Sequence, residues 1–195
     1  MKRLLAAAVA AALSFSTAPA FADGWSLAPE HSKVAFGSIK SGTVGEAHHF
    51  TGLTGTVGED GAAAVQIDVT KLETWVDIRN ERMLKHVFDA INFPKVEITG
   101  KIDMAAASAL KPGESTILSE EITVKFLETE LPLDAELFVL AVSDDMVLVT
   151  TDEMLMVETA DLGIDGGVDE LMELASLESI TRVTPVTLRL MFEKN

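Results

Sequence analysis

Apolar and polar residues alternate in several separate windows of this chain, and no other feature limits its fold as strongly. The alternation runs through residues 33–36, 65–70, 96–102, 122–127 and 186–193. A two-residue period places successive side chains on opposite faces of a strand, so each window has one apolar and one mostly polar face. Antiparallel sheets that are covered on one side show this pattern. The windows therefore predict a mainly β fold built from antiparallel strands.

The remaining apolar segments bring the expected number of strands to about eight, a number that suits a closed barrel. One further strand begins at His48 and bends at Gly52 and Gly55, because glycine marks bends and bulges in strands. Residues 133–142 and 146–157 are more continuously apolar, so their inward faces are ambiguous. We therefore expect an antiparallel eight-stranded barrel.

Two segments have the period of an amphipathic helix instead. Residues 79–90 place their apolar side chains on one face, and Asp77 is the expected N-cap. Residues 168–177 have a second such face, whereas residues 104–113 have the composition of a loop. A helix with one apolar face can close an open barrel end. We therefore expect one or two short helices near the barrel ends.

The N-terminal segment has the pattern of a cleavable signal peptide. Lys2 and Arg3 precede an apolar run, and Ala20-Phe21-Ala22 is the small-x-small pattern that signal peptidase cuts. The apolar run is too short to be a transmembrane anchor. We expect residues 1–22 to be removed, which leaves a single domain over residues 23–195 that is periplasmic or secreted, without stable membrane insertion.

The chain is strongly acidic, with a formal net charge of −16 at pH 7 that becomes two units more negative once Lys2 and Arg3 are removed. Such a surface repels phosphate backbones and anionic headgroups, which argues against nucleic acid as a partner. The chain contains no cysteine, so its stability must come from a hydrophobic core. Whether it forms a homodimer is left open by the sequence.

A series of short motifs runs along the chain. They are Trp25-x-Leu27-x-Pro29-x-His31-Ser32-x-Val34-x-Phe36, Phe50-x-Gly52-x-x-Gly55, Arg79-Asn80 with Phe88 and Phe93-Pro94, and Ala160-Asp161-Leu162-Gly163 with Pro185-Val186-Thr187. In order and spacing these motifs resemble the YceI-like family of exported, lipocalin-fold proteins that bind polyisoprenoids. Members commonly have Arg-Asp-x-His-Leu where this chain has Arg79-Asn80-Glu81-Arg82-Met83, so no role of that Asp or His is carried over.

The resemblance implies a lipocalin-like barrel whose apolar interior holds a long isoprenoid, quinone-like or polyprenyl, or a similar amphiphilic lipid, for carriage or sequestration. A dry tunnel is enough for binding, because each buried methylene group gains about 0.8 kcal/mol. The inward faces of the strands and the helical segment supply the expected lining. These residues are Val34, Phe36, Val65, Ile67, Trp75, Met83, Phe88, Phe93, Ile98, Val124, Phe126, Leu188 and Leu190.

The same side chains could instead fill the barrel themselves, because eight strands enclose an interior on the border between filled and ligand-sized. The protein would then be a non-enzymatic interaction or stress-response scaffold whose acidic exterior binds a basic partner. A continuous apolar tunnel favours the lipid carrier, and a packed interior favours the scaffold.

Patterns for catalysis and metal binding are missing from the sequence. The chain has neither a cysteine nucleophile nor a Gly-x-Ser-x-Gly turn. Among its four histidines, the adjacent His48 and His49 would point to opposite faces of a strand and could not easily share a metal. Residues 161–172 do not have the ligand spacing of a calcium-binding loop. We therefore expect no enzymatic activity, no metal site and no cofactor besides a bound isoprenoid lipid.

Overall fold

The computed structural model describes residues 24–195, and the expected signal peptide at residues 1–22 lies outside this range. Within the described range, no helix combines the length and the apolar character needed to cross a membrane. Strands dominate the architecture, as the alternating windows predicted.

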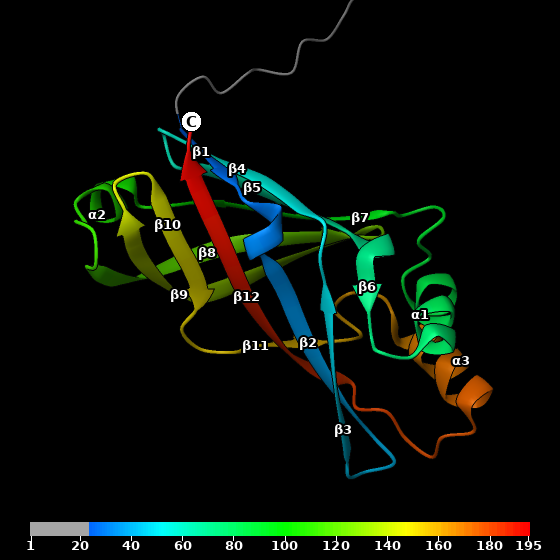
Figure 1. Cartoon of the computed structure of the whole chain (residues 1–195). Helices are drawn as coiled ribbons and strands as arrows, with labels where there is room; N and C mark the ends of the chain where they lie inside the picture. Colours follow the sequence, from blue (N-terminus) through cyan, green and yellow to red (C-terminus); the bar gives the residue numbers. More distant parts are fainter. Residues whose placement is uncertain (1–23) are drawn as a thin grey trace, which may run out of the picture.

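The strands of residues 24–195 form one antiparallel sheet that closes on itself (Figure 1). They are β1 (Gly24–Leu27), β2 (Lys33–Lys40), β3 (Val44–Phe50), β4 (Leu53–Gly58), β5 (Ala62–Asp68), β6 (Leu72–Glu73), β7 (Lys95–Lys101), β8 (Ser115–Phe126), β9 (Thr129–Ser143), β10 (Met146–Thr151), β11 (Leu155–Glu158) and β12 (Val183–Lys194). The ring closes because the first strand, β1, pairs with both β4 and the last strand, β12.

Four walls of this barrel are strands that break into two pieces. β1 continues as β2, β3 as β4, β5 as β6 and β10 as β11, because the two pieces of each pair share at least one neighbouring wall. The breaks contain the 3₁₀ turns η1 (Pro29–His31) and η2 (Val69–Lys71), and Gly52 with its left-handed φ of +70°. With the unbroken β7, β8, β9 and β12, the walls number eight. The expected eight-stranded antiparallel barrel and the bend at Gly52 are confirmed.

Three short helical segments cover one end of the barrel (Figure 1). The helix α1 (Asp77–Arg82) leads directly into the π-helical turn η3 (Met83–Val87), in which the Phe88 N–H donates to the Met83 carbonyl at 2.9 Å. The helix α3 (Asp165–Ala175) packs on this turn, and its Glu170 Oε1 lies 2.7 Å from His86 Nδ1. The expected helical cover of a barrel end is confirmed.

The α3 helix approaches η3 so closely that backbone meets backbone. A Cβ atom added at Gly167 would lie 2.1 Å from the His86 carbonyl oxygen and 2.7 Å from the Val87 Cα. Glycine is therefore required at this position for the helix to dock. Docking buries Val168 and Leu171 of α3.

Two local expectations were wrong. Val76, not Asp77, occupies the N-cap position of α1, and Asp77 is the first helical residue, where a carboxylate still favours the helix dipole. Residues 104–113 begin with the helix α2 (Met104–Ser108), which covers the opposite end of the barrel (Figure 1). Its N-cap is Asp103, whose carboxylate accepts the Ala105 N–H at 2.9 Å and so makes a helical turn favourable there.

Candidate ligand-binding cavity

A cavity of about 450 Å³ occupies the half of the barrel nearest α1 and α3. Its wall comes from the inner faces of strands including β2, β3, β8, β11 and β12, and α1, η3 and α3 complete it at the end. Pockets that hold small molecules have volumes of about 300–1,000 Å³. The barrel is therefore not filled by its own side chains, which was the question that the sequence left open.

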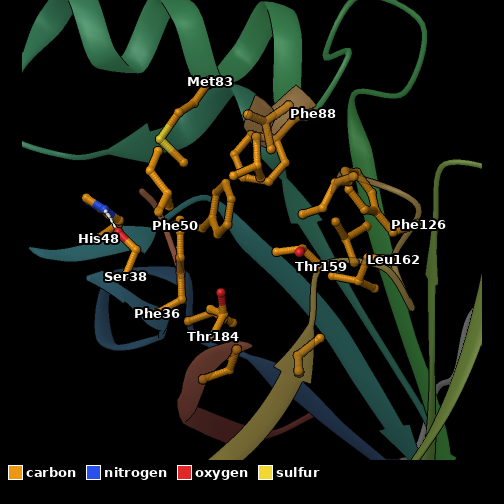
Figure 2. Close-up of a pocket in the computed structure, with 18 of the residues that line it drawn as sticks. Phe36, Ser38, His48, Phe50, Met83, Phe88, Phe126, Thr159, Leu162 and Thr184 are labelled. Carbon is orange, nitrogen blue, oxygen red and sulfur yellow. Dashed lines mark hydrogen bonds between the residues drawn. The ribbon is translucent and has the colours of Figure 1, made fainter. Parts of the chain in front are cut away.

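Four phenylalanines from different parts of the chain meet in this wall, as Figure 2 shows. Phe36 of β2 stacks on Phe50 of β3, with ring centroids 5.4 Å apart. Phe88, which follows η3, meets Phe50 edge-on with ring centroids 5.4 Å apart, and its centroid lies 5.8 Å from that of Phe126 of β8. Such ring pairs contribute about 0.5–1.5 kcal/mol each beyond their buried area. Phe88 thus joins the helical cover to two separate parts of the strand wall.

The charged groups of the wall gather where the β2–β3 hairpin meets α1. Within residues 24–195, the wall carries charge at Lys40, Glu46, Arg79 and Arg82 only. Glu46 accepts hydrogen bonds from Lys40 Nζ at 2.7 Å and from the Arg79 guanidinium, which also donates to the Thr74 carbonyl. Burial alone would raise the pKa of Glu46, but the hydrogen bonds and charges of Lys40 and Arg79 outweigh it and hold the pKa below its ordinary value. The otherwise apolar cavity therefore has one polar end.

The His48 imidazole lies in the same wall, and only 2% of its surface is exposed. Its Nε2 lies 3.3 Å from Ser38 Oγ (Figure 2), whereas its Nδ1 has no hydrogen-bond partner among the described residues. Burial, followed by the positive charge of Arg79, lowers the pKa of His48 to about 4. The ring is therefore neutral at physiological pH. His49, the next residue, faces outward, and its ring centroid lies 5.6 Å from that of the exposed Trp75.

The low pKa of His48 predicts an acid-sensitive fold. On acidification the unfolded chain, in which the pKa returns to about 6.5, binds the proton first. The free energy of unfolding should therefore fall by up to about 1.4 kcal/mol for each pH unit between 6.5 and the folded-state pKa, and His48 should contribute no pH dependence above this window. Urea unfolding of the wild type and of His48→Gln at neutral pH and at about pH 5 measures this contribution.

The Glu46 carboxyl does not obscure this measurement. Its pKa is lowered, so its contribution to the free energy of unfolding is lost only when the pH falls below the ordinary pKa of a glutamate. The His48→Gln variant should lose less stability than the wild type between the two pH values. Equal losses in the two proteins would contradict a buried, neutral His48.

Nine of the thirteen side chains expected to line the cavity lie in its wall. They are Val34, Phe36, Ile67, Met83, Phe88, Ile98, Val124, Phe126 and Leu188. Val65 and Leu190 lie instead around a second cavity of about 110 Å³, beneath α2.

The placement of the last two expected residues was wrong, because neither Trp75 nor Phe93 lines either cavity. Trp75 has a left-handed φ of 65°, which ends the run of extended backbone after β6, and 74% of its surface is exposed. Phe93 closes a turn by donating its N–H to the Asp89 carbonyl at 2.9 Å, and this turn keeps it away from the barrel interior.

Sequence reasoning missed the part of the wall that follows β10. Leu155 and Val157 of β11, Leu162 in the next loop, and Val168 and Leu171 of α3 all line the cavity. The apolar face of α3 was visible in the sequence, but the residue period alone did not say what this face covers.

Comparisons with known proteins agree with this geometry. A model of the YceI-like domain matches residues 25–180. Among solved structures, a polyisoprenoid binding domain from Saccharophagus degradans implicated in plant cell wall breakdown is 29% identical, with a TM-score of 0.86, and the match covers 88% of this chain and 98% of that one. BcnA from Burkholderia cenocepacia is 16% identical with a TM-score of 0.64 over 85% of this chain and 98% of its own, and supports the fold alone.

No curated protein matches the chain. The YceI-like domain model nevertheless covers most of it, and the barrel agrees with the solved structures over nearly their whole length. As the sequence motifs indicated, this protein belongs to the YceI-like domain family.

Proposed function

We propose that this protein binds the chain of a long isoprenoid lipid, quinone-like or polyprenyl, inside its barrel and carries or sequesters it without catalysing a reaction. The observation that carries this proposal is the cavity of about 450 Å³, whose wall is apolar apart from one polar end. The similarity to a polyisoprenoid binding domain supports the same class of ligand.

The energetics of the cavity suit a hydrocarbon tail. Each methylene group that leaves water contributes about 0.8 kcal/mol, so one five-carbon unit contributes roughly 3–4 kcal/mol before the tail is ordered. No directed polar contact is needed along the tail. The phenylalanine cluster around Phe88 supplies apolar surface against which such a tail can pack.

The polar end of the cavity orients the ligand in this proposal. Lys40, Arg79 and Arg82 outnumber the single carboxylate of Glu46 there, in a chain whose net charge is −16. A neutral or anionic head group is favoured at this end, because a cationic one would meet like charge. The tail then extends away from α1 toward the middle of the barrel.

We also propose that the protein works outside the cytoplasm. The support is the Lys2-Arg3 start, the apolar run and the Ala20-Phe21-Ala22 pattern, which together favour export and cleavage. A periplasmic carrier could shelter a lipid tail between two membranes, where water would otherwise surround it.

The scaffold alternative is less well supported. A barrel that exists only to present its acidic surface would gain stability by filling its interior, because cavities lower the free energy of unfolding. A void of about 450 Å³ is the opposite arrangement.

The direct test is native mass spectrometry of the protein purified gently from its own host. We expect a fraction of the protein to carry a noncovalent adduct with the mass of a prenyl lipid or quinone, which organic extraction releases for identification. As a control, the Val124→Arg variant purified in parallel should carry no adduct. Wild-type protein that is empty throughout this procedure, and also fails to take up added prenols, would contradict the proposal.

A further inference from the structure

The barrel interior is divided into two chambers in series. The large chamber is the cavity of about 450 Å³ beside α1 and α3, and the small chamber is the cavity of about 110 Å³ beneath α2. Ile98, Ile122 and Leu188 line both of them, and together we call these three residues the partition. We propose that the partition is the stop that sets the longest lipid tail this protein can enclose, an inference that rests on the proposed function.

The partition is built from three walls of the barrel. Ile98 lies on β7, Ile122 on β8 and Leu188 on β12. Ile122 and Leu188 are 6% and 7% exposed, so neither extends into open solvent. Ile98 packs against the buried cluster that contains Ile122 and against the one that contains Leu188. Side chains that project from three walls and all border both chambers can block the passage between them, whereas a residue on one wall would only narrow it.

Local packing holds Ile122 in place. It faces Gly100 of β7 across the strand pair, and a Cβ atom on that glycine would lie 3.2 Å from Ile122 Cγ2. On its other side, Ile122 forms a separate buried cluster with Ala135 and Leu137 of β9. The absence of a side chain at Gly100 thus makes room for Ile122, and the β9 side chains support it.

The small chamber is suited to hydrocarbon and not to a head group. No charged residue lines it, and its wall includes Trp25, Val65, Leu190 and Phe192. Met104 and Ala107 of α2 cover its end. A tail whose head group lies at the polar end of the large chamber would meet the partition before it reached this space.

This arrangement predicts a limit on the gain in affinity with tail length. For tails that end within the large chamber, each added five-carbon unit should raise affinity at least tenfold, because more methylene groups leave water. Once the tail meets the partition, further units stay outside the large chamber in contact with water. The affinity of the wild type should then stay constant as the tail is lengthened.

The experiment uses a series of all-trans prenols from geraniol through farnesol and geranylgeraniol to solanesol. The chain has two tryptophans, and Trp25 lines the small chamber while Trp75 is exposed. In a Trp75→Phe background, therefore, the emission of Trp25 reports directly on the small chamber. Dissociation constants and Trp25 emission are measured for every prenol, and circular dichroism checks that each variant is folded.

The informative variants remove the partition from either side. For each protein we compare the dissociation constant for geraniol with those for the longest prenols. In Ile122→Ala and in Leu188→Ala, this ratio should favour the longest prenols at least tenfold more than it does in the Trp75→Phe parent. The two variants should also make Trp25 emission respond to long prenols and not to short ones. Having two variants on different strands keeps the test valid if one of them fails to fold. The matched control is Thr123→Ala, next to Ile122 on the same strand, because Thr123 lines neither chamber and its substitution should leave the length limit unchanged.

The outcomes separate this inference from the proposed function. Binding without a length limit, or a Trp25 response to long prenols in the parent equal to that in Ile122→Ala, would overturn the stop and leave lipid binding intact. A limit that stays at the same prenol in both folded partition variants would also overturn it. If no prenol binds to any of the proteins, both the inference and the proposed function fail.

Discussion

Replacing Val124 by arginine should lower the affinity for a long prenol at least a hundredfold. Val124 lies on β8 between Ile122 and Phe126, and its side chain faces the large chamber. A tail that enters beside the new guanidinium must strip it of water without offering a hydrogen bond or an opposite charge. The cost exceeds the roughly 2.7 kcal/mol that corresponds to a hundredfold loss. Titration with geranylgeraniol measures the effect.

The adjacent residue supplies the control. Thr123 lines neither cavity, because neighbouring residues of a strand face opposite sides. Thr123→Arg introduces the same charge on the same strand and should leave binding within a factor of a few of the wild type. If both variants bound equally well while circular dichroism showed intact barrels, the tail would have to lie outside the cavity.

Replacing Gly167 by valine should lower the free energy of unfolding by about 3–6 kcal/mol. The new side chain would collide with backbone atoms of His86 and Val87, which cannot rotate away as a flexible side chain would. The helix α3 must then leave η3 and expose Val168 and Leu171, each of which contributes about 1.5–3 kcal/mol by burial. Urea unfolding measures the loss, and prenol binding should weaken as well because α3 forms part of the cavity wall.

Gly166 provides a matched substitution one residue away. A Cβ added there would meet no atom within 4 Å beyond its chain neighbours and the backbone of its own helix, and the residue lies within α3. Gly166→Ala should therefore raise the free energy of unfolding by about 0.4–1 kcal/mol, because alanine loses less conformational freedom on folding. If the free energy of unfolding rises at Gly166 and falls at Gly167, the loss at Gly167 comes from its backbone contact with η3 and not from a general effect of replacing a helical glycine. A Gly167→Val protein as stable as the wild type would show that α3 does not pack on η3.

The fold was largely predictable because its determinants are local. Alternation through residues 65–70 and 186–193 identifies strands with one buried face, and the structure has β5 and β12 over most of these windows. Gly52 identified a bend because few other residues adopt its φ of +70° at little cost. The sequence also predicted the number of walls, although turns divide four of these walls into two strands each.

The cavity was predictable only in part, because its wall depends on contacts between distant segments. Residues such as Val34 and Phe126 could be placed inside from their strand period. Trp75 could not, because its left-handed backbone turns the chain two residues after β6, and a tryptophan gives no sequence signal for such a turn. The contribution of α3 was hidden for another reason: its apolar face was clear, but only the docking of Gly167 on η3 determines which cavity that face covers.

The pairing of β1 with β12 also has a consequence for how the barrel assembles. Trp25 lies opposite Lys194, so the first and last strands of the described chain are neighbours. During synthesis the N-terminal strand can pair early with β4, but it must wait for β12 before the ring can close, and such long-range pairing slows folding. Until then, apolar strand edges stay open to aggregation, which makes a chaperone valuable. The same delay would suit the export proposed above, because a chain that stays unfolded can pass through a translocation channel.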